Sequence, residues 1–198
     1  MILRIFRWIG GKERLLIINT RRIKLNTYKN IICNPPDDDN KRFLLGKKGR
    51  NEMLAIGLNP STANEDNLDP TSRNIQAIAQ NNGCDGWWLV NLYPKRTSKP
   101  SKLPKKVNQA IVKGNIDFIQ ELIHNDNNIS KILFCWGNHI NDHPYLKKQA
   151  DQIITILREL DLKPLCLGKT LAGNPLHPAP MVVNRFFGGI NDVVLKKY

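Results

Sequence analysis

Residues 53–61 read Met53-Leu54-Ala55-Ile56-Gly57-Leu58-Asn59-Pro60-Ser61. The first six residues form an unbroken apolar run, which is typical of a strand that a parallel sheet buries on both faces. The polar Asn59 and the rigid Pro60 end the run and begin a loop. We therefore expect a central strand at residues 53–58, with Asn59 at its carboxyl end.

Three further apolar runs follow this strand, and helical patterns separate them. The runs are residues 87–90, 131–136 and 164–167. The first intervening helix is expected to open at Asp69-Pro70, with Asp69 as its N-cap, and to extend to about Asn81. Further helices are expected at residues 107–124 and 145–160, and from about Asn184 or later to Leu195.

Strands that alternate with helices indicate βαβ units. We therefore predict an α/β fold, a three-layer α/β/α sandwich around a central, mainly parallel, four-stranded sheet. This domain is expected to span residues 42–198, and residues 42–51 could form an edge hairpin that leads into it. Residues 1–41 are expected to be a basic, partly β-structured N-terminal extension, because short apolar runs alternate there with Arg and Lys.

The chain carries a large positive charge. Of its 198 residues, 30 are Lys or Arg and 17 are Asp or Glu, so the formal net charge is +13. This excess favours a polyanionic partner, most simply nucleic acid, although a merely basic, solvated surface would give the same count. No run of 18 or more apolar residues exists, so no membrane contact is expected. The first eleven residues lack the apolar core of a signal peptide, and the expected location is the cytoplasm.

The cysteines give no sign of a metal site. They are Cys33, Cys84, Cys135 and Cys166, and no two of them form a C-x-x-C pair. Zinc and iron–sulfur sites usually take their ligands from such local pairs. Cys135 and Cys166 lie in apolar runs and are expected in the core. We therefore expect no metal and no cofactor.

A proline-rich stretch near the C-terminus presents a histidine. Three prolines lie between residues 175 and 180, and they exclude a continuing helix or a central strand. They are expected to hold His177 on a stiffened loop, with Met181 at its tip. Arg185 and a pair of phenylalanines follow.

Polar residues also follow the predicted strands. Asn59 and Asn91 come directly after apolar runs, and the Asn138-His139 pair follows another run after Gly137. In open parallel sheets, ligands bind beyond the carboxyl ends of the strands. The sequence therefore predicts one shared site, made by these residues and the loop of His177.

The predicted site contains amides and a histidine, without an obvious carboxylate pair or nucleophile. The chain also lacks the glycine-rich phosphate loops and the G-x-S-x-G elbow. Amides and imidazole suit recognition of a base edge, positioning of water and stabilisation of a leaving anion. Each motif alone has a plainer interpretation: a turn at residues 59–61, a strand terminator at Asn91, an exposed loop residue at His177 and a packing residue at Met181.

Taken together, the motifs resemble the uracil-DNA glycosylase superfamily, over roughly residues 42–195. Residues 57–61, Gly-Leu-Asn-Pro-Ser, resemble its first catalytic motif in the mismatch-specific and single-strand-selective branches. Residues 177–181, His-Pro-Ala-Pro-Met, resemble its second motif, His-Pro-Ser-Pro-Leu. Asn91 and the Trp136-Gly137 strand end also resemble superfamily features, and the full set is similar to an uncharacterised bacterial family of about this length.

The resemblance implies a monofunctional, base-flipping DNA glycosylase that leaves an abasic site. Asn59 would position the attacking water, and His177 would hydrogen-bond the base oxygen on which negative charge develops. Asn91 would read the flipped base, and Leu58 and Ser61 would line its pocket. Met181 would fill the gap in the base stack. The candidates for phosphate contacts are Lys95, Arg96, Lys99, Lys102 and Arg185. The partner would be single- or double-stranded DNA, and the protein is expected to be a monomer.

Two departures from the superfamily pattern bear on the substrate. Ser61 stands where the strict uracil enzymes have a Tyr that crowds C5 of the base, and Asn59 stands where they have an Asp that activates water. We therefore hypothesise a C5-substituted or hypermodified cytosine or uracil, as in phage DNA under an antiviral role, with plain uracil second. A non-catalytic protein that binds DNA or a modified base, an enzyme of free nucleotides, and an RNA substrate remain alternatives.

Overall fold

The computed structural model of the chain describes residues 2–9, 12–19 and 30–198, with side chains from residue 30 onward. Near the N-terminus, β1 (Ile2–Ile9) and β2 (Lys12–Asn19) form an antiparallel hairpin whose register pairs Ile2 with Asn19. The expected extension is therefore β-structured over these two segments. Its residues 1, 10–11 and 20–29 lie outside the described residues.

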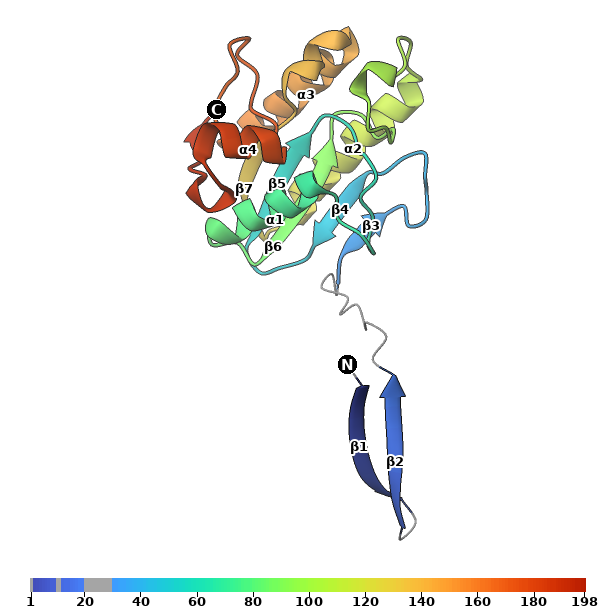
Figure 1. Ribbon diagram of the computed structural model, residues 1–198. Helices are drawn as coiled ribbons and strands as arrows, with labels where there is room; N and C mark the ends of the chain where they lie inside the picture. Colours follow the sequence, from blue (N-terminus) through green and yellow to red (C-terminus); the bar gives the residue numbers. More distant parts are fainter. Residues whose placement is uncertain (1, 10–11, 20–29) are drawn as a thin grey trace.

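The remaining strands form one sheet in the order β3-β4-β6-β5-β7-β8-β9 (Figure 1). Their bounds are β3 (Ile32–Asn34), β4 (Leu44–Lys47), β5 (Glu52–Gly57), β6 (Gly86–Asn91), β7 (Ile129–Phe134), β8 (Leu165–Cys166) and β9 (Lys196–Lys197). β5 pairs in parallel with β6 and β7, and β7 pairs in parallel with β8. β3, β4 and β9 join by antiparallel pairing.

The α/β class is confirmed, but the prediction of a four-stranded, mainly parallel sheet is wrong, because the sheet formed by the described residues is mixed and has seven strands. The additional strands are two to four residues long and lie toward the two edges. β3 and β9 are too short to display a periodic hydrophobic pattern, so they were not predicted as strands of this sheet, whereas β4 lies within residues 42–51, where an edge hairpin was expected. β3 also comes from the segment expected to be an extension, and its Cys33 is buried in the core of the domain.

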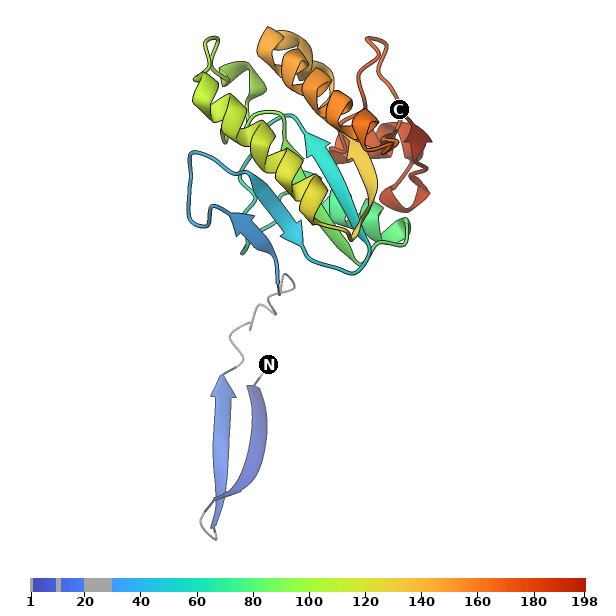
Figure 2. The same cartoon turned by 180° about the vertical axis from the view of Figure 1, so that it is seen from behind.

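In the part of the chain that the structure describes, four α-helices cover the sheet, two on each face (Figures 1 and 2). They are α1 (Pro70–Asn81), α2 (Gln109–Asn125), α3 (Pro144–Glu159) and α4 (Pro180–Phe187). α1 and α4 pack against Met53 and Ala55 of β5, whereas α2 and α3 pack against Leu54 and Ile56 of the same strand. Successive residues of β5 thus face opposite layers, and all of them are buried.

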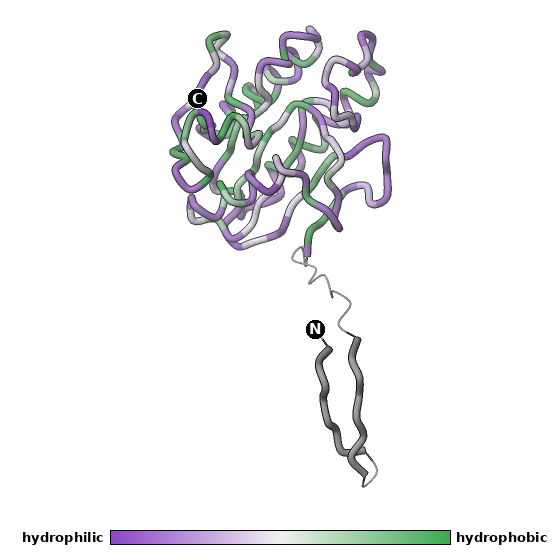
Figure 3. Tube along the Cα trace, viewed as in Figure 1, coloured by the Kyte–Doolittle hydropathy of each residue, from purple (hydrophilic) through white to green (hydrophobic). Residues whose placement is uncertain are grey.

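The hydropathy of the chain follows this layering. Figure 3 shows hydrophobic colours along much of the central sheet and hydrophilic colours along most of the connecting loops. Cys135 and Cys166 are in the core, as predicted. None of the helices in the described part of the chain has both the length and the apolar character that crossing a membrane requires.

The last helix begins earlier than predicted. α4 starts at Pro180 rather than near Asn184, because proline is tolerated in the first turn of a helix, where its missing N–H would be unpaired in any case. It ends at Phe187, where Gly188 adopts a left-handed φ of 81°. Met181 therefore lies in the first turn of α4 rather than at the tip of a loop.

Candidate active site

A cavity of about 580 Å³ lies at the carboxyl ends of the parallel strands. It brings together the five residues that were expected to catalyse the reaction or to hold the base: Leu58, Asn59, Ser61, Asn91 and His177. Its volume falls within the roughly 300–1,000 Å³ that is usual for small-molecule sites. The topology explains the arrangement, because neighbouring parallel strands end at one edge of the sheet.

Asn59 is held in one orientation by the loop that faces it. Its Nδ2 donates to the carbonyl oxygens of Pro60 and Thr97, at 2.8 Å each. Two carbonyls can only accept, so they require the amide nitrogen on that side, and Oδ1 is the side-chain atom that can bind a water. An Asp in this position would set a carboxylate against the same two carbonyls, so the local structure requires an amide.

Asn91 is nearly inaccessible, at 2 % exposed. Its Nδ2 is buried and has no hydrogen-bond partner among the described residues. The backbone that carries it is fixed, because Asn115 Nδ2 donates to the Asn91 carbonyl at 2.9 Å. A Cβ on Gly57 would lie 2.9 Å from Asn91 Oδ1, so only glycine leaves room for this amide. A buried donor without a partner costs free energy, which a ligand with a hydrogen-bond acceptor would recover.

The loop of His177 is anchored on both sides of the histidine. Gly137 N donates to the Pro175 carbonyl at 3.1 Å, and Leu176 N donates to the Gly168 carbonyl at 2.8 Å. On the other side, Asn74 Nδ2 donates from α1 to the Pro178 carbonyl at 2.8 Å. The prolines and these hydrogen bonds together hold His177 rigidly on the cavity wall.

Burial lowers the pKa of His177 below its usual value of 6.5. The negative charge of Asp69 acts in the opposite direction, and His139 adds to the lowering. The imidazole is therefore neutral at pH 7. A neutral imidazole carries one N–H, which can donate to an oxygen that gains negative charge.

Gly137 makes the close approach of His177 possible. It has a left-handed φ of 72°, and a Cβ there would lie 3.2 Å from His177 Cβ. We expect Gly137→Ala to lower the free energy of unfolding by about 1–3 kcal/mol, measured by urea denaturation, because its φ of 72° and ψ of −171° lie in a region that is essentially confined to glycine. It should also displace the histidine and impair any activity that depends on it.

Gly173→Ala is the matched control for that substitution. Gly173 has a similar φ of 80°, but a Cβ there meets nothing within 4 Å. Both variants should lose stability because of the positive φ, whereas only Gly137→Ala should lose activity. Equal activity in the two variants would contradict a role for the contact between Gly137 and His177.

The basic loop after β6 forms part of the cavity wall through Thr97, Ser98 and Pro100. Three of the residues expected to contact phosphate, Lys95, Lys99 and Lys102, are exposed on this loop and do not line the cavity. Arg96 points inward, where its Nη1 donates to the carbonyls of Ser61 (3.1 Å) and Ala63 (2.8 Å). Arg96 therefore stabilises the turn that follows β5. Unlike the three exposed lysines, Arg96 is only partly exposed to solvent.

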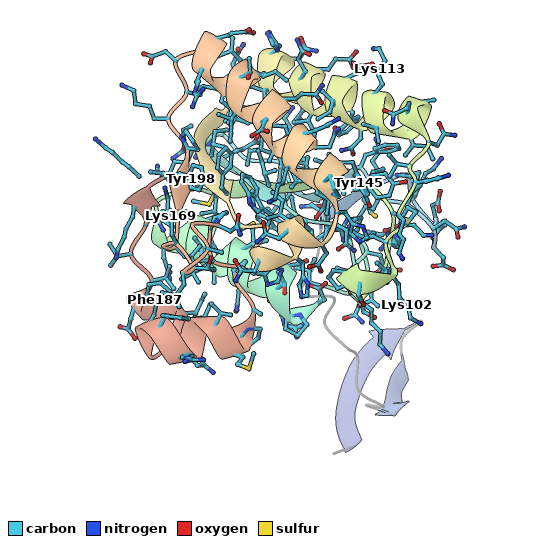
Figure 4. All side chains as sticks on the ribbon, turned by 90° about the horizontal axis from the view of Figure 1, so that it is seen from above. Lys102, Lys113, Tyr145, Lys169, Phe187 and Tyr198 are labelled. Atoms are coloured by element: carbon cyan, nitrogen blue, oxygen red, sulfur yellow. The ribbon has the colours of Figure 1, made fainter. Side chains whose placement is uncertain are left out.

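The expected stack-filling residue lies beside the cavity. Pro180 lines the cavity, and Met181, next to it on α4, is 78 % exposed. Arg185 is also exposed on α4, with its guanidinium carbon 5.7 Å from the centre of the Phe186 ring. Figure 4 looks down on this edge of the sheet and shows Lys102 and the α4 residue Phe187 on opposite sides of the molecule. The basic loop and α4 therefore flank the edge that holds the cavity.

Sequence reasoning missed several groups that line the cavity. Asp69 was expected only to cap α1, and it does accept from Ser72 N at 2.7 Å, but its carboxylate also lines the cavity. Arg42 lines it as well, only 1 % exposed, with burial lowering its pKa to about 10. The position of Asp69 was open to prediction, because the helix that follows a parallel strand begins at the carboxyl edge of the sheet. Nothing in the sequence near Arg42 indicated its burial.

His139 lines the cavity too, at the end of β7. It is exposed, and its Nδ1 lies 2.7 Å from Asp142 Oδ2. Asn138 beside it accepts hydrogen bonds from Thr170 and Asn174, and so ties this strand end to the segment that leads to His177. Within the described residues, no group of three or more His, Cys, Asp or Glu side chains could hold a metal ion.

Comparison with known proteins identifies the family. The family model described as "Protein of unknown function (DUF1643)" matches residues 42–179, and the chain therefore belongs to that family. The matched residues include β4 to β8 and every residue assigned above to the cavity except Pro180. No curated protein and no solved structure matches the chain.

Proposed function

We propose that this member of the DUF1643 family is a monofunctional DNA glycosylase of the uracil-DNA glycosylase superfamily. It would flip a pyrimidine out of DNA into the cavity and hydrolyse its N-glycosidic bond, leaving an abasic site. The observation that carries the proposal is the convergence of three groups on one cavity: the Asn59 side chain, whose Nδ2 is held by two carbonyls, the unpartnered amide of Asn91 and the rigid, neutral His177.

The three groups fit the three tasks of this reaction. Asn91 can donate and accept at once, which matches the alternating donors and acceptors on the edge of a pyrimidine. Asn59 Oδ1 can hold a water. The transition state of glycosidic cleavage is oxocarbenium-like, so electrons move onto the departing base, where the His177 N–H can stabilise them.

The surface around the cavity supports a DNA substrate. Flipping a base costs a few kcal/mol of stacking and pairing. Met181, exposed beside the cavity, could fill the gap in the stack, and the lysines of the basic loop could neutralise phosphates. The protein would act as a monomer on DNA in the cytoplasm.

The choice of base rests on the turn that follows β5. Ser61 lines the cavity with a small side chain, so it leaves space beside the base. We propose that this space accepts a C5 substituent, and that the substrate is a modified cytosine or uracil, such as the hypermodified bases of phage DNA, with plain uracil second. Excision of phage bases would serve antiviral defence.

Release of free bases tests the proposal. Genomic DNAs with different base modifications are incubated with the protein, the released bases are identified by mass spectrometry, and abasic sites are revealed by alkaline cleavage. We expect release of a C5-substituted pyrimidine by the wild-type protein and a rate about 10²–10³-fold lower for Asn59→Ala. The exposed Asn127, in the turn between α2 and β7, provides the control Asn127→Ala, which should be fully active.

Three results would change the proposal. Binding to DNA without any abasic sites would indicate a non-catalytic binding protein. Cleavage at uracil, with C5-substituted duplexes intact, would contradict the proposed substrate. A normal rate for Asn59→Ala would contradict the assignment of the water to this residue.

A further inference from the structure

The proposed reaction needs a group that the three residues above do not provide. Water that attacks C1′ must lose a proton, and an amide such as Asn59 cannot accept one. His177 is committed to the departing base as a hydrogen-bond donor. A nearby acceptor is therefore required.

Asp69 is the one carboxylate among the described residues that line the cavity. It lies at the far end of the loop that starts with Asn59, at the point where α1 begins. Its Oδ1 is fixed by the hydrogen bond from Ser72 N, so the position of the second oxygen is also set by the cap. The side chain is half-buried, which limits screening by water.

The negative charge of Asp69 acts on two other residues that line the cavity. It opposes the lowering of the His177 pKa by burial, and it opposes the lowering of the Arg42 pKa. A negative charge here would favour the positive charge that develops on the sugar in an oxocarbenium-like transition state.

We infer that Asp69 is the general base of the proposed reaction, so the inference rests on the proposed function. The water held by Asn59 forms the new C1′–O bond, and one water proton passes to Asp69 Oδ2. The C1′–N bond breaks, and its electron pair leaves with the base. The His177 N–H donates a hydrogen bond to the oxygen of the departing base. The proton on Asp69 then returns through solvent to the departed base anion, which restores the carboxylate.

His139 is the rival acceptor, because Asp142 orients its imidazole across the 2.7 Å contact. It is exposed at the edge of the cavity, whereas Asp69 is half-buried and is coupled to His177 through charge. Burial strengthens an electrostatic effect on the transition state, so the structure favours Asp69.

Asp69→Asn separates catalysis from folding, because Asn is as good an N-cap as Asp. We expect this variant to unfold at the wild-type temperature and to release bases about 10²–10⁴-fold more slowly. His139→Gln, prepared in parallel, tests the rival acceptor, and its loss of rate should be clearly smaller than that of Asp69→Asn. A wild-type rate for Asp69→Asn, or a larger loss for His139→Gln, would overturn the inference while leaving the proposed function intact.

Binding of abasic-site analogues supplies a second readout that needs no turnover. A pyrrolidine in place of the sugar carries a positive charge, whereas a tetrahydrofuran does not. The wild-type protein should bind a duplex with the pyrrolidine at least about tenfold more tightly than one with the tetrahydrofuran, and Asp69→Asn should lose this preference. A wild-type protein without the preference overturns the role of Asp69, and one that releases no base from any DNA overturns the proposed function.

Discussion

Replacement of His177 by alanine is expected to slow base release by about 10²–10³-fold and to leave the affinity for DNA nearly unchanged. The reason is that the imidazole contributes mainly when charge develops on the base, after the DNA is bound. Single-turnover assays of base release and a separate binding titration measure the two effects. The exposed His124, whose Nδ1 contacts the Gln120 carbonyl on α2, gives the control His124→Ala.

The buried state of His177 also predicts a response to acid. Burial lowers the pKa of His177 in the folded protein below 6.5, so the folded state binds fewer protons there than the unfolded chain as the pH falls through 6.5. The stabilising effect of His177 is therefore present above pH 6.5 and is lost as the pH falls through the lowered pKa. Base release by the wild-type protein should persist to a pH somewhat below 6.5. Equal rates of release for His177→Ala and His124→Ala at pH 7 would remove His177 from the mechanism.

The main strands were predictable because they leave a strong signal. A strand such as residues 53–58, buried between two layers of helices, must be apolar at every position, and it ends where polar residues can reach solvent or a ligand. Asn59 and Asn91 could be placed together on this basis, since parallel strands end at a common edge. The short β9 left no such signal: it consists of Lys196 and Lys197, which pair with β8 by backbone hydrogen bonds alone.

The parts of the site that were missed depend on side-chain direction. Arg96 was counted with the basic loop, yet its guanidinium donates to the carbonyls of the turn after β5, which are partly shielded from water and need donors. Asp69 caps α1 and lines the cavity at once, and a sequence motif reveals only the first of these roles. Composition gives the charge of a loop, whereas the fold decides which charges turn inward.

Replacement of the exposed lysines of the basic loop is expected to change the salt dependence of DNA binding strongly. If Lys95, Lys99 and Lys102 each neutralise one phosphate, their combined replacement by Gln should reduce the slope of log K against log salt by about 2.7, at about 0.9 for each contact. Between 50 and 200 mM salt, the affinity of the triple variant for DNA should therefore fall by a factor roughly 40 times smaller than does the affinity of the wild-type protein. Fluorescence anisotropy with a labelled duplex at several salt concentrations measures the slope.

A second triple variant, with Lys48, Lys113 and Lys163 replaced by Gln, removes the same charge elsewhere. All three residues are exposed, and none lines the cavity. Lys48 and Lys163 precede β5 and β8 and so lie at the opposite edge of the sheet, while Lys113 lies on α2, well apart from Lys102 in Figure 4. Because counterions are released only where lysines meet phosphates, this variant should keep the wild-type slope. Equal changes of slope in the two variants would mean that the net charge of +13 attracts DNA without a defined face, and the basic loop would then have no special part in binding.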